Sequence, residues 1–297
     1  MRWSYEHIPD QSGKTAIVTG ANGGLGCETA KALAARGARV VMACRNLKKG
    51  LEAAAAIRKD YPDAKTEVLE LDLADLSSIR NFVTAFTWMN GRLDLLVNNA
   101  GVMIPPYGQT KDGFELQFGT NHLGHFAVTA LLFVKLRVTE HSRIISISSI
   151  AHRAGRFDPA NLHAENKYKR MGAYGISKLA NLLFTYELQR RIDTAGLKMI
   201  AAAAHPGWTA TGLQRYAGLY RYLNPLFAQK PLMGALPTLR AATDPHVRGG
   251  DYYGPGTFME LRGNPVKVKS SKQSYDREAA ALLWEMSEKM TGISFKV

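Results

Sequence analysis

At 297 residues, with 46% hydrophobic and 21% charged residues, the chain has the composition of a globular protein that can bury a sizeable core. Its two cysteines argue against a disulfide framework, and no apolar run approaches the roughly 18 residues of a membrane span, so we expect a cytoplasmic protein without an integral membrane segment. The net charge of +13 comes from dispersed basic residues without a nucleic-acid-binding motif, and the histidines lack metal-ligand spacing. We therefore expect neither nucleic acid nor a metal as a partner.

The first predicted element is a strand over residues 14–20, which runs into a glycine-rich turn and a helix over residues 28–36. Glycines let the backbone approach a pyrophosphate, and the free amides and dipole of a helix N-terminus attract its charge. The pattern Gly-x-x-x-Gly-x-Gly thus indicates a dinucleotide-binding turn, although a tight turn without a ligand uses glycines in the same way. The turn residues expected to bind the dinucleotide are Gly20, Asn22, Gly24, Leu25 and Gly26.

A second strand is predicted over residues 38–44, and it ends in Cys44 and Arg45. An NAD-selective protein places an acidic residue here to bind the ribose hydroxyls. Because a guanidinium pairs well with phosphate, Arg45 predicts NADP (NADPH in the reduced form) in preference to NAD. The alternative interpretation is an arginine that is simply solvated at a strand end.

Strands and helices then alternate at the spacing typical of a parallel, doubly wound sheet. Helices are predicted over residues 47–59, 76–89, 112–136, 174–192, 234–243 and 276–290. Strands are predicted over residues 66–71, 93–97, 143–148 and 198–204, with an edge strand at 251–253 or 257–259. Residues 151–172 are polar, basic and without periodicity, which predicts a long loop. No repeat or linker interrupts the chain, so we expect a single domain over residues 1–297: a Rossmann-type α/β sheet of about seven strands with helices on both faces.

Tyr174 and Lys178 are four residues apart, so on a helix their side chains lie on one face. A tyrosine hydroxyl ordinarily titrates near pH ~10, but a neighbouring ammonium stabilises the phenolate and lowers that pKa. The pair can therefore act as a general acid/base. The same spacing is common on solvated helix faces, so the interpretation depends on the other motifs of the chain.

Those motifs, taken together, resemble the short-chain dehydrogenase/reductase family in order and spacing, over nearly the whole chain. The matching residues are Thr19-Gly20-x-x-x-Gly24-x-Gly26, Asp72, Asn98-Asn99-Ala100-Gly101, Asn121, Ser149, Tyr174-x-x-x-Lys178 and Pro206-Gly207. Within the family, residues 43–46 and 177–181 are similar to the retinol dehydrogenase-like branch. The separation of Ser149 from Tyr174 is longer than in many family members, as it also is in that branch.

The resemblance implies a catalytic tetrad. Tyr174 would exchange the proton with the substrate oxygen, and Ser149 would hydrogen-bond that oxygen. Lys178 would lower the pKa of Tyr174 and hold the nicotinamide ribose. Asn121 would anchor a water that relays protons to Lys178. Of the two serines, Ser148 would be the structural neighbour. The further cofactor-binding residues implied are Asp72, Leu73, Asn99, Ala100, Gly101, Tyr174, Lys178, Pro206, Gly207, Thr209 and Thr211.

The resemblance also implies that the two halves of the domain have different functions. Residues 12–110 would form the cofactor-binding half and residues 111–297 the catalytic and substrate-binding half, with a substrate lid at about 209–232. The lid is rich in leucine and tyrosine, which favours a lipophilic substrate that is retinoid-like, steroid-like or a long-chain carbonyl. In the family the helices over 112–136 and 174–192 pair across a two-fold axis, so a homodimer is a further expectation.

The function expected is that of an NADP(H)-dependent oxidoreductase that interconverts an alcohol and a ketone or aldehyde by hydride transfer. One alternative is a dinucleotide-binding regulator or scaffold without turnover, against which the complete tetrad argues. Another is a double-bond reductase with the same fold. The product of the reaction distinguishes the two chemistries.

Overall fold

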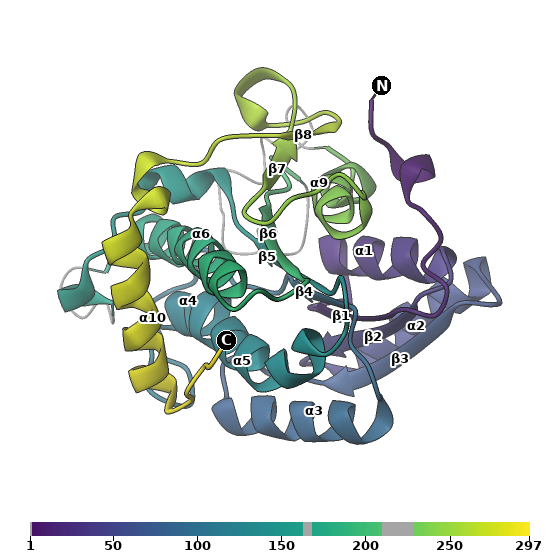
Figure 1. Ribbon diagram of the computed structural model, residues 1–297, viewed down its shortest axis with the longest axis horizontal. Coiled ribbons are helices and arrows are strands. Elements are labelled where there is room, and N and C mark those ends of the chain that lie inside the picture. The colour runs from purple at the N-terminus through teal and green to yellow at the C-terminus, as the bar shows by residue number, and fades with distance from the viewer. Residues whose placement is uncertain (1, 163–167, 210–228) are drawn as a thin grey trace.

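The parallel sheet expected from the sequence is present in the computed structural model, which describes residues 2–162, 168–209 and 229–297. In the described residues the sheet has eight strands in the order β3-β2-β1-β4-β5-β6-β7-β8 (Figure 1). The strands are β1 Thr15–Thr19, β2 Arg39–Cys44, β3 Lys65–Glu70, β4 Leu95–Asn98, β5 Arg143–Ile147, β6 Ile200–Ala204, β7 Tyr252–Pro255 and β8 Pro265–Lys267. All pairs are parallel except β7 with β8. The antiparallel β8 raises the count above the seven strands predicted.

The last strands settle which edge segment pairs with the sheet. β7 begins at Tyr252, which confirms a strand at the first of the two alternatives, but β8 lies outside it and forms the edge of the sheet. Residues 258–260 form a short 3-10 helix instead of a strand. Met259 and Glu260 have positive φ angles of 54° and 58°, which no extended strand allows.

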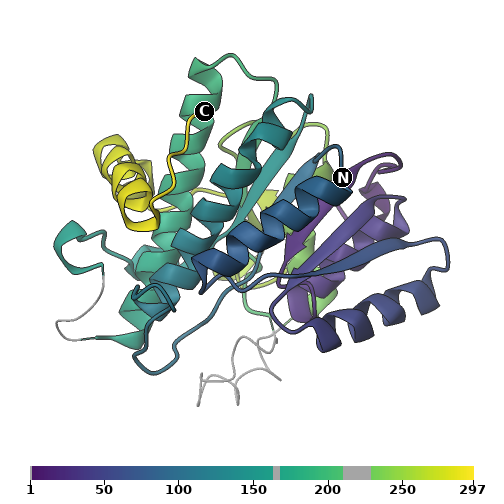
Figure 2. The same cartoon turned by 90° about the horizontal axis from the view of Figure 1, so that it is seen from below.

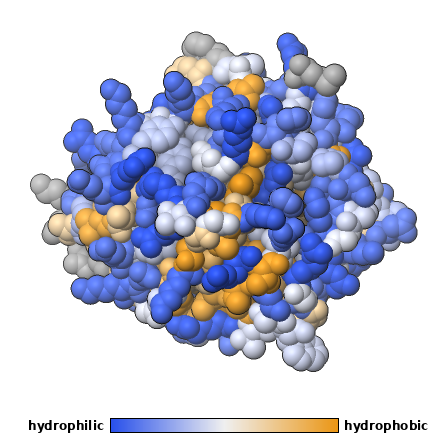
Figure 3. Space-filling view, in the orientation of Figure 1, coloured by the Kyte–Doolittle hydropathy of each residue, from blue (hydrophilic) through white to orange (hydrophobic). Residues whose placement is uncertain are grey.

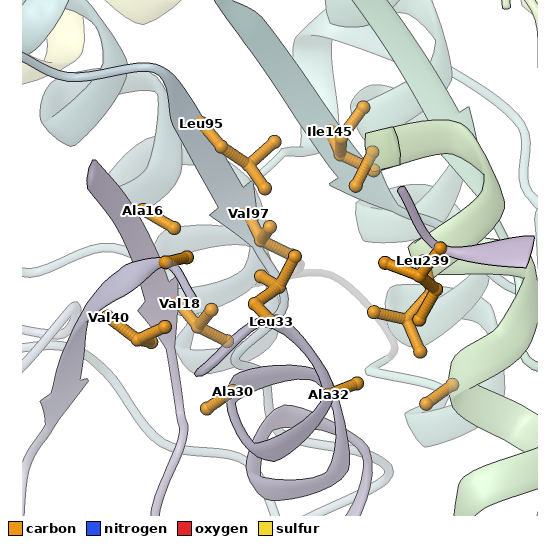
Figure 4. Close-up of a cluster of buried hydrophobic side chains, with 14 of the residues drawn as sticks. Ala16, Val18, Ala30, Ala32, Leu33, Val40, Leu95, Val97, Ile145 and Leu239 are labelled. Carbon is orange, nitrogen blue, oxygen red and sulfur yellow. The ribbon is translucent and has the colours of Figure 1, made fainter. Parts of the chain in front are cut away.

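Helices cover both faces of the sheet, as Figures 1 and 2 show. One face packs against α1 Gly24–Ala35, α2 Leu47–Asp60 and α9 Pro231–Thr243. The other face packs against α3 Leu76–Met89, α5 Gly124–Arg137 and α6 Arg170–Thr194. Central strands such as β1 are buried along their full length, which explains their continuous apolar sequence. Figure 4 shows Leu33 of α1 reaching toward Val18 of β1 and Val97 of β4 in the first of these cores.

The helix predicted over 112–136 is divided into three parts in the structure. A short helix α4 spans Leu116–Phe118, a π-helical turn spans Gly119–Leu123, and α5 follows. The helix begins later than predicted because the Glu115 carboxylate accepts hydrogen bonds from the amides of Gln117 and Phe118 and so caps it. The π-helical turn contains Asn121, and such turns are frequent at functional sites.

The segment before Tyr174 contains helical turns that the sequence does not predict, in the part of residues 151–172 that lies outside the undescribed residues 163–167. Short 3-10 helices occupy Ile150–Ala154 and Pro159–Asn161, and α6 begins at Arg170, one turn before the predicted start. Tyr174 therefore lies within the helix instead of at its first position. Residues 170–173 continue the helix without an apolar stripe, which is why the sequence pattern does not reveal them.

A last helix, α10 Arg277–Thr291, packs against α6 (Figure 1). Its Trp284 and the following Phe295 join the same aromatic cluster as Phe126 and Phe184. The apolar residues that led to the homodimer prediction are all buried in clusters that include residues of α10: Phe126, Leu132, Phe133, Leu183, Phe184 and Leu188. These residues are thus already buried within one chain, and a homodimer stays a prediction without their support.

The face of the molecule seen in Figure 3 is largely hydrophilic. Figure 3 shows one face on which hydrophobic residues gather over α5, where Val134 and Val138 are exposed. Among the described residues, no helix is both long enough and apolar enough to cross a lipid bilayer.

Candidate active site

The turn between β1 and α1 has the geometry that a dinucleotide requires. Gly20 and Gly24 adopt left-handed φ angles of 68° and 55°, which side chains disfavour. A Cβ on Gly26 would lie 2.5 Å from Asn99 Nδ2 and closer still to the Gly20 carbonyl oxygen. The N-terminus of α1 therefore packs directly against the end of β1, and Asn22 and Leu25 are half-buried in the same turn. A cradle of this shape fits a pyrophosphate.

Arg45 stands at the carboxyl end of β2, beside the end of β3. Its side chain is largely exposed, with Nη1 4.0 Å from the Asp72 carboxylate, a separation too long for a hydrogen bond. Asp72 is instead anchored locally, since its Oδ1 accepts the amide of Ala74 at 3.0 Å. Leu73 is buried against Gly124 of α5. The structure thus leaves the Arg45 guanidinium able to reach an anionic group at this edge.

A buried network joins the cradle to the π-helical turn. Thr19 Oγ1 accepts the amides of Asn99 and Ala100, each at 2.9 Å, and lies 2.9 Å from His125 Nε2 and 3.3 Å from the Val97 carbonyl. His125 Nδ1 then donates to the backbone carbonyl of Asn121 at 2.9 Å. Burial lowers the pKa of His125 to about 4, so the imidazole is neutral and has the tautomer that this chain of bonds requires.

Three of the four tetrad residues converge at the carboxyl end of β5. The Ser149 side chain lies near enough to the Tyr174 hydroxyl to favour its ionised form and so to lower its pKa. Lys178 lies one turn along α6, with Nζ 5.7 Å from the centre of the Tyr174 ring and donating to the Ile147 carbonyl at 3.1 Å. Ser148 points the other way and donates to the Lys178 carbonyl at 2.9 Å, in agreement with its expected structural role.

Asn121 is the fourth member, and its side chain is fully engaged. Its Oδ1 accepts the amide of Val102 at 2.7 Å, and its Nδ2 donates to the Val102 carbonyl and to Ser177 Oγ, both at 2.9 Å. A Cβ on Gly101 would lie 2.9 Å from Asn121 Oδ1 and 3.7 Å from Lys178 Nζ. Glycine at 101 is therefore what allows the strand end to approach both residues.

The protonation of the Tyr174–Lys178 pair differs from the sequence-based expectation. Burial raises the pKa of Tyr174 to about 12, and the nearby Ser149 side chain opposes this only in part. Burial likewise lowers the pKa of Lys178 to about 8. The expected lowering of the tyrosine pKa by Lys178 is absent here because desolvation dominates and Lys178 Nζ is directed toward Ile147. At neutral pH Tyr174 thus holds its proton.

The segment after β6 lies beside this site. Gly207 has a φ of 63° and packs against the Leu261 carbonyl, while Thr209 Oγ1 donates to the Pro206 carbonyl at 2.9 Å. Gln229 Nε2 donates to the same carbonyl at 2.7 Å. Thr211 and most of the proposed lid, residues 210–228, lie outside the described residues.

Sequence reasoning missed several side chains that position the site. His152 Nδ1 donates to the Ser149 carbonyl at 2.6 Å, and its Nε2 accepts the Ser271 amide at 3.0 Å. His125 and Gln117 are the other buried polar residues of this kind. His125 lies four residues after Asn121, the spacing of neighbours on one helix face, and that signal was available in the sequence.

A family model described as "short chain dehydrogenase" matches residues 14–219. Retinol dehydrogenase 12 of Mus musculus is 40% identical over 96% of this chain and 88% of its own length, and retinol dehydrogenase 11 of Homo sapiens is 40% identical over 95% and 86%. A crystal structure of a putative uncharacterized protein from Mycobacterium Paratuberculosis superposes with a TM-score of 0.85, at 41% identity and with 100% of both chains covered. The chain therefore belongs to the short-chain dehydrogenase/reductase family, in its retinol dehydrogenase-like branch, and is an NAD(P)-dependent oxidoreductase of CH–OH and C=O groups.

Proposed function

We propose that this enzyme uses NADP(H) to interconvert a lipophilic primary or secondary alcohol and its aldehyde or ketone. The observation that carries the proposal is that the protonated Tyr174 hydroxyl and the Ser149 side chain come together at the same sheet edge as the glycine cradle. When bound, the nicotinamide supplies or accepts the hydride.

Each tetrad residue has a role that its contacts support. Tyr174 donates its proton to a carbonyl oxygen during reduction and takes it back during oxidation. Ser149 holds that oxygen by a hydrogen bond that strengthens as negative charge develops. Lys178, with a pKa lowered to about 8, is a mainly charged group at neutral pH that can hold a ribose hydroxyl. Asn121 fixes the strand end against α6 through Val102 and Ser177.

Two observations support the choice of cofactor and substrate. Arg45 is exposed at the end of β2, in the place where a 2′-phosphate lies in dinucleotide-binding sheets of this kind. The relatives that cover most of the chain are named retinol dehydrogenases, and retinol is an apolar alcohol. Residues 209–232 are rich in leucine and tyrosine, a composition that fits an apolar substrate.

The test is the reduction of straight-chain aldehydes from four to ten carbons with NADPH. We expect kcat/KM to rise with chain length, since each buried methylene contributes about 0.8 kcal/mol. Tyr174→Phe should lower kcat by about 10³-fold without weakening NADPH binding, because the ring still packs while the proton donor is lost.

Tyr186→Phe is the matched control, because Tyr186 lies on the same helix but hydrogen-bonds Ser270 away from the site. Retention of a tenth of the wild-type rate by Tyr174→Phe would refute the assignment of Tyr174. A flat or falling dependence on chain length would refute the lipophilic substrate.

A further inference from the structure

Ser149 begins a short helical turn, and its own side chain caps that turn. Ser149 Oγ accepts the Ala151 amide at 3.2 Å, which occupies one lone pair of the hydroxyl and leaves its proton free to be donated. This polarity suits the proposed role of Ser149, because an oxygen on which negative charge develops needs a donor. The direction of the hydroxyl therefore depends on how firmly the Ser149 backbone is held.

His152 holds that backbone from within the same turn. Its amide and its Nδ1 both donate to the Ser149 carbonyl, at 3.0 Å and 2.6 Å. A backbone amide can make the first bond whatever residue stands at position 152, so only the second depends on the imidazole. The bond from Nδ1 is thus a restraint on Ser149 that requires a histidine side chain.

The other nitrogen of the ring joins this turn to the C-terminal part of the chain. His152 Nε2 accepts the Ser271 amide at 3.0 Å, a contact between residues 119 positions apart. The Ser271 carbonyl is itself held, since Ser274 Oγ donates to it at 2.6 Å. The imidazole therefore has a fixed partner outside its own turn.

These two partners determine the tautomer of His152. A carbonyl can only accept and an amide can only donate, so Nδ1 carries the proton and Nε2 carries the lone pair. A second proton would direct Nε2–H at the Ser271 amide and break that contact. The ring is buried edge-to-face against Tyr252, and burial lowers the pKa of His152 to about 4, which keeps the imidazole neutral at pH 7.

Close backbone packing fixes the same turn against α6. A Cβ on Gly155 would lie 2.5 Å from the Gly175 carbonyl oxygen, and a Cβ on Gly175 would lie 2.9 Å from the Ala151 carbonyl oxygen. Gly175 directly follows Tyr174 in α6. The turn thus has two anchors, the α6 backbone beside Tyr174 and the imidazole of His152. Loss of the imidazole would leave Ser149 freer to shift relative to Tyr174.

We propose that His152 is a positioning residue for the reaction: its Nδ1–H tautomer, braced by the Ser271 amide, holds the Ser149 hydroxyl where it can donate to the substrate oxygen. His152 itself touches no reacting atom and exchanges no proton. The segment around Ser271 thereby contributes to turnover through this side chain. The inference rests on the proposed function through the donor role of Ser149.

The tautomer can be measured without turnover. NMR of protein with isotope-labelled histidine distinguishes a ring protonated at Nδ1 from one protonated at Nε2, and the signal missing from His152→Asn identifies His152. We expect His152 to be neutral at pH 7 and protonated at Nδ1. A proton on Nε2 instead, or a charged ring, overturns the proposal.

Three substitutions separate the contributions of the two nitrogens. His152→Asn keeps a donor near the place of Nδ1, His152→Gln keeps an acceptor near the place of Nε2, and His152→Phe keeps only a flat ring. We expect the single-turnover rate of decanal reduction by bound NADPH to fall about ten- to a hundredfold in His152→Phe and His152→Gln, the range that a small misplacement of a reacting group produces. The fall should be much smaller in His152→Asn, and the NADPH dissociation constant should not change. A wild-type rate in His152→Phe, or equal losses in the phenylalanine and asparagine variants, overturns the proposal.

Phe295→Ala controls for a loss of stability alone. The Phe295 ring is buried in the aromatic cluster of Trp284, which is separate from the small cluster that contains Tyr174. This variant should lower the melting temperature and keep the wild-type single-turnover rate. A rate as low as that of His152→Phe would mean that lost stability explains both, against the proposal. The asparagine and glutamine variants each keep one polar partner, so their comparison decides the matter even if His152→Phe does not fold.

A double-mutant cycle with Ser149→Ala tests whether His152 acts through Ser149. Once the hydroxyl is removed its direction no longer matters, so His152→Phe should slow the Ser149→Ala protein by less than about twofold. Losses that multiply in the double variant overturn the inference and leave the proposed function intact. A wild-type rate in Ser149→Ala alone would refute the proposed role of Ser149, and the inference with it.

Discussion

Gly26 offers the sharpest test of how the dinucleotide cradle is built. Its Cα faces the Gly20 carbonyl and the side chain of Asn99, which itself donates to the Thr19 carbonyl at 2.7 Å. A Cβ at this position would come closer than 3.0 Å to both groups, nearer than real Cβ atoms approach. Neither neighbour is a flexible side-chain end that can move away, since one is backbone and the other is anchored. Gly26→Ala must therefore displace α1 from β1.

The expected cost follows from three contributions. Overpacking against fixed neighbours costs about 1–3 kcal/mol. Loss of the Asn99–Thr19 hydrogen bond adds about 1 kcal/mol. The better helix propensity of alanine offsets about 1 kcal/mol. The net loss of about 2 kcal/mol should lower the melting temperature by roughly 4–8 °C, given about 2–4 °C per kcal/mol for a domain of similar size.

The cradle should also bind the cofactor less tightly. Displacement of one amide that would contact the pyrophosphate removes about 1.5–3 kcal/mol, or about ten- to a hundredfold in affinity. Circular dichroism melting and NADPH fluorescence titration measure the two effects. Gly23→Ala is the matched control, because a Cβ there meets nothing within 4 Å and the φ of 171° is ordinary extended backbone. A Gly26→Ala protein with the melting temperature and NADPH affinity of the Gly23→Ala control would refute the reasoning.

Three further predictions concern the cofactor, the last helix and acid stability. Arg45→Ala should lower the preference for NADPH over NADH by about ten- to a hundredfold, the value of one charge-assisted contact, and an unchanged ratio of dissociation constants contradicts its role. Phe295→Ala should destabilise the protein by about 3–5 kcal/mol in urea unfolding, because the Phe295 ring is buried among four aromatic rings. Leu282 is half-exposed, so Leu282→Ala should have less than a third of that effect. Burial lowers the pKa values of three histidines from 6.5 to about 3, 4 and 4. These imidazoles therefore stay neutral in the folded state at pH values where they bind protons in the unfolded chain. The free energy of unfolding should fall as the pH drops from 6.5 toward 4, by up to about 1.4 kcal/mol per pH unit for each histidine. These histidines are His122, His125 and His152, and a melting temperature that is constant between pH 7 and pH 5 would contradict this account.

The sequence predicted those parts of the fold that depend on local pattern. Apolar runs between glycine-rich turns placed β1, β2 and α1 near their observed positions, and the four-residue spacing brought Tyr174 and Lys178 onto one side of α6. Apolar periodicity could not reveal the π-helical turn at Asn121, because residues 119–123 are buried on all sides. It also could not show that α10 covers α5 and α6, since that contact joins segments far apart in the chain.

The protonation states of Tyr174 and Lys178 could not be predicted from the sequence for a different reason. A tyrosine and a lysine four residues apart suggest mutual stabilisation of charge, but the sign of a pKa shift depends on burial, which only the folded chain reveals. The network from Thr19 through His125 to the Asn121 carbonyl likewise depends on three segments meeting in space. Of these connections, the sequence offered a signal only for the one between His125 and Asn121, through their four-residue spacing.

The position of α10 in the chain has a consequence for the order of events during synthesis on the ribosome. Helices α5 and α6 end at Arg137 and Thr194, so they leave the ribosome well before α10, which begins at Arg277. Domains generally fold as units, and exposed apolar surface makes incomplete chains prone to aggregate. Until Trp284 has been translated and docked, the nascent chain presents Phe126 and Phe184 without their cover. We expect a chaperone to bind this exposed apolar surface until α10 has docked.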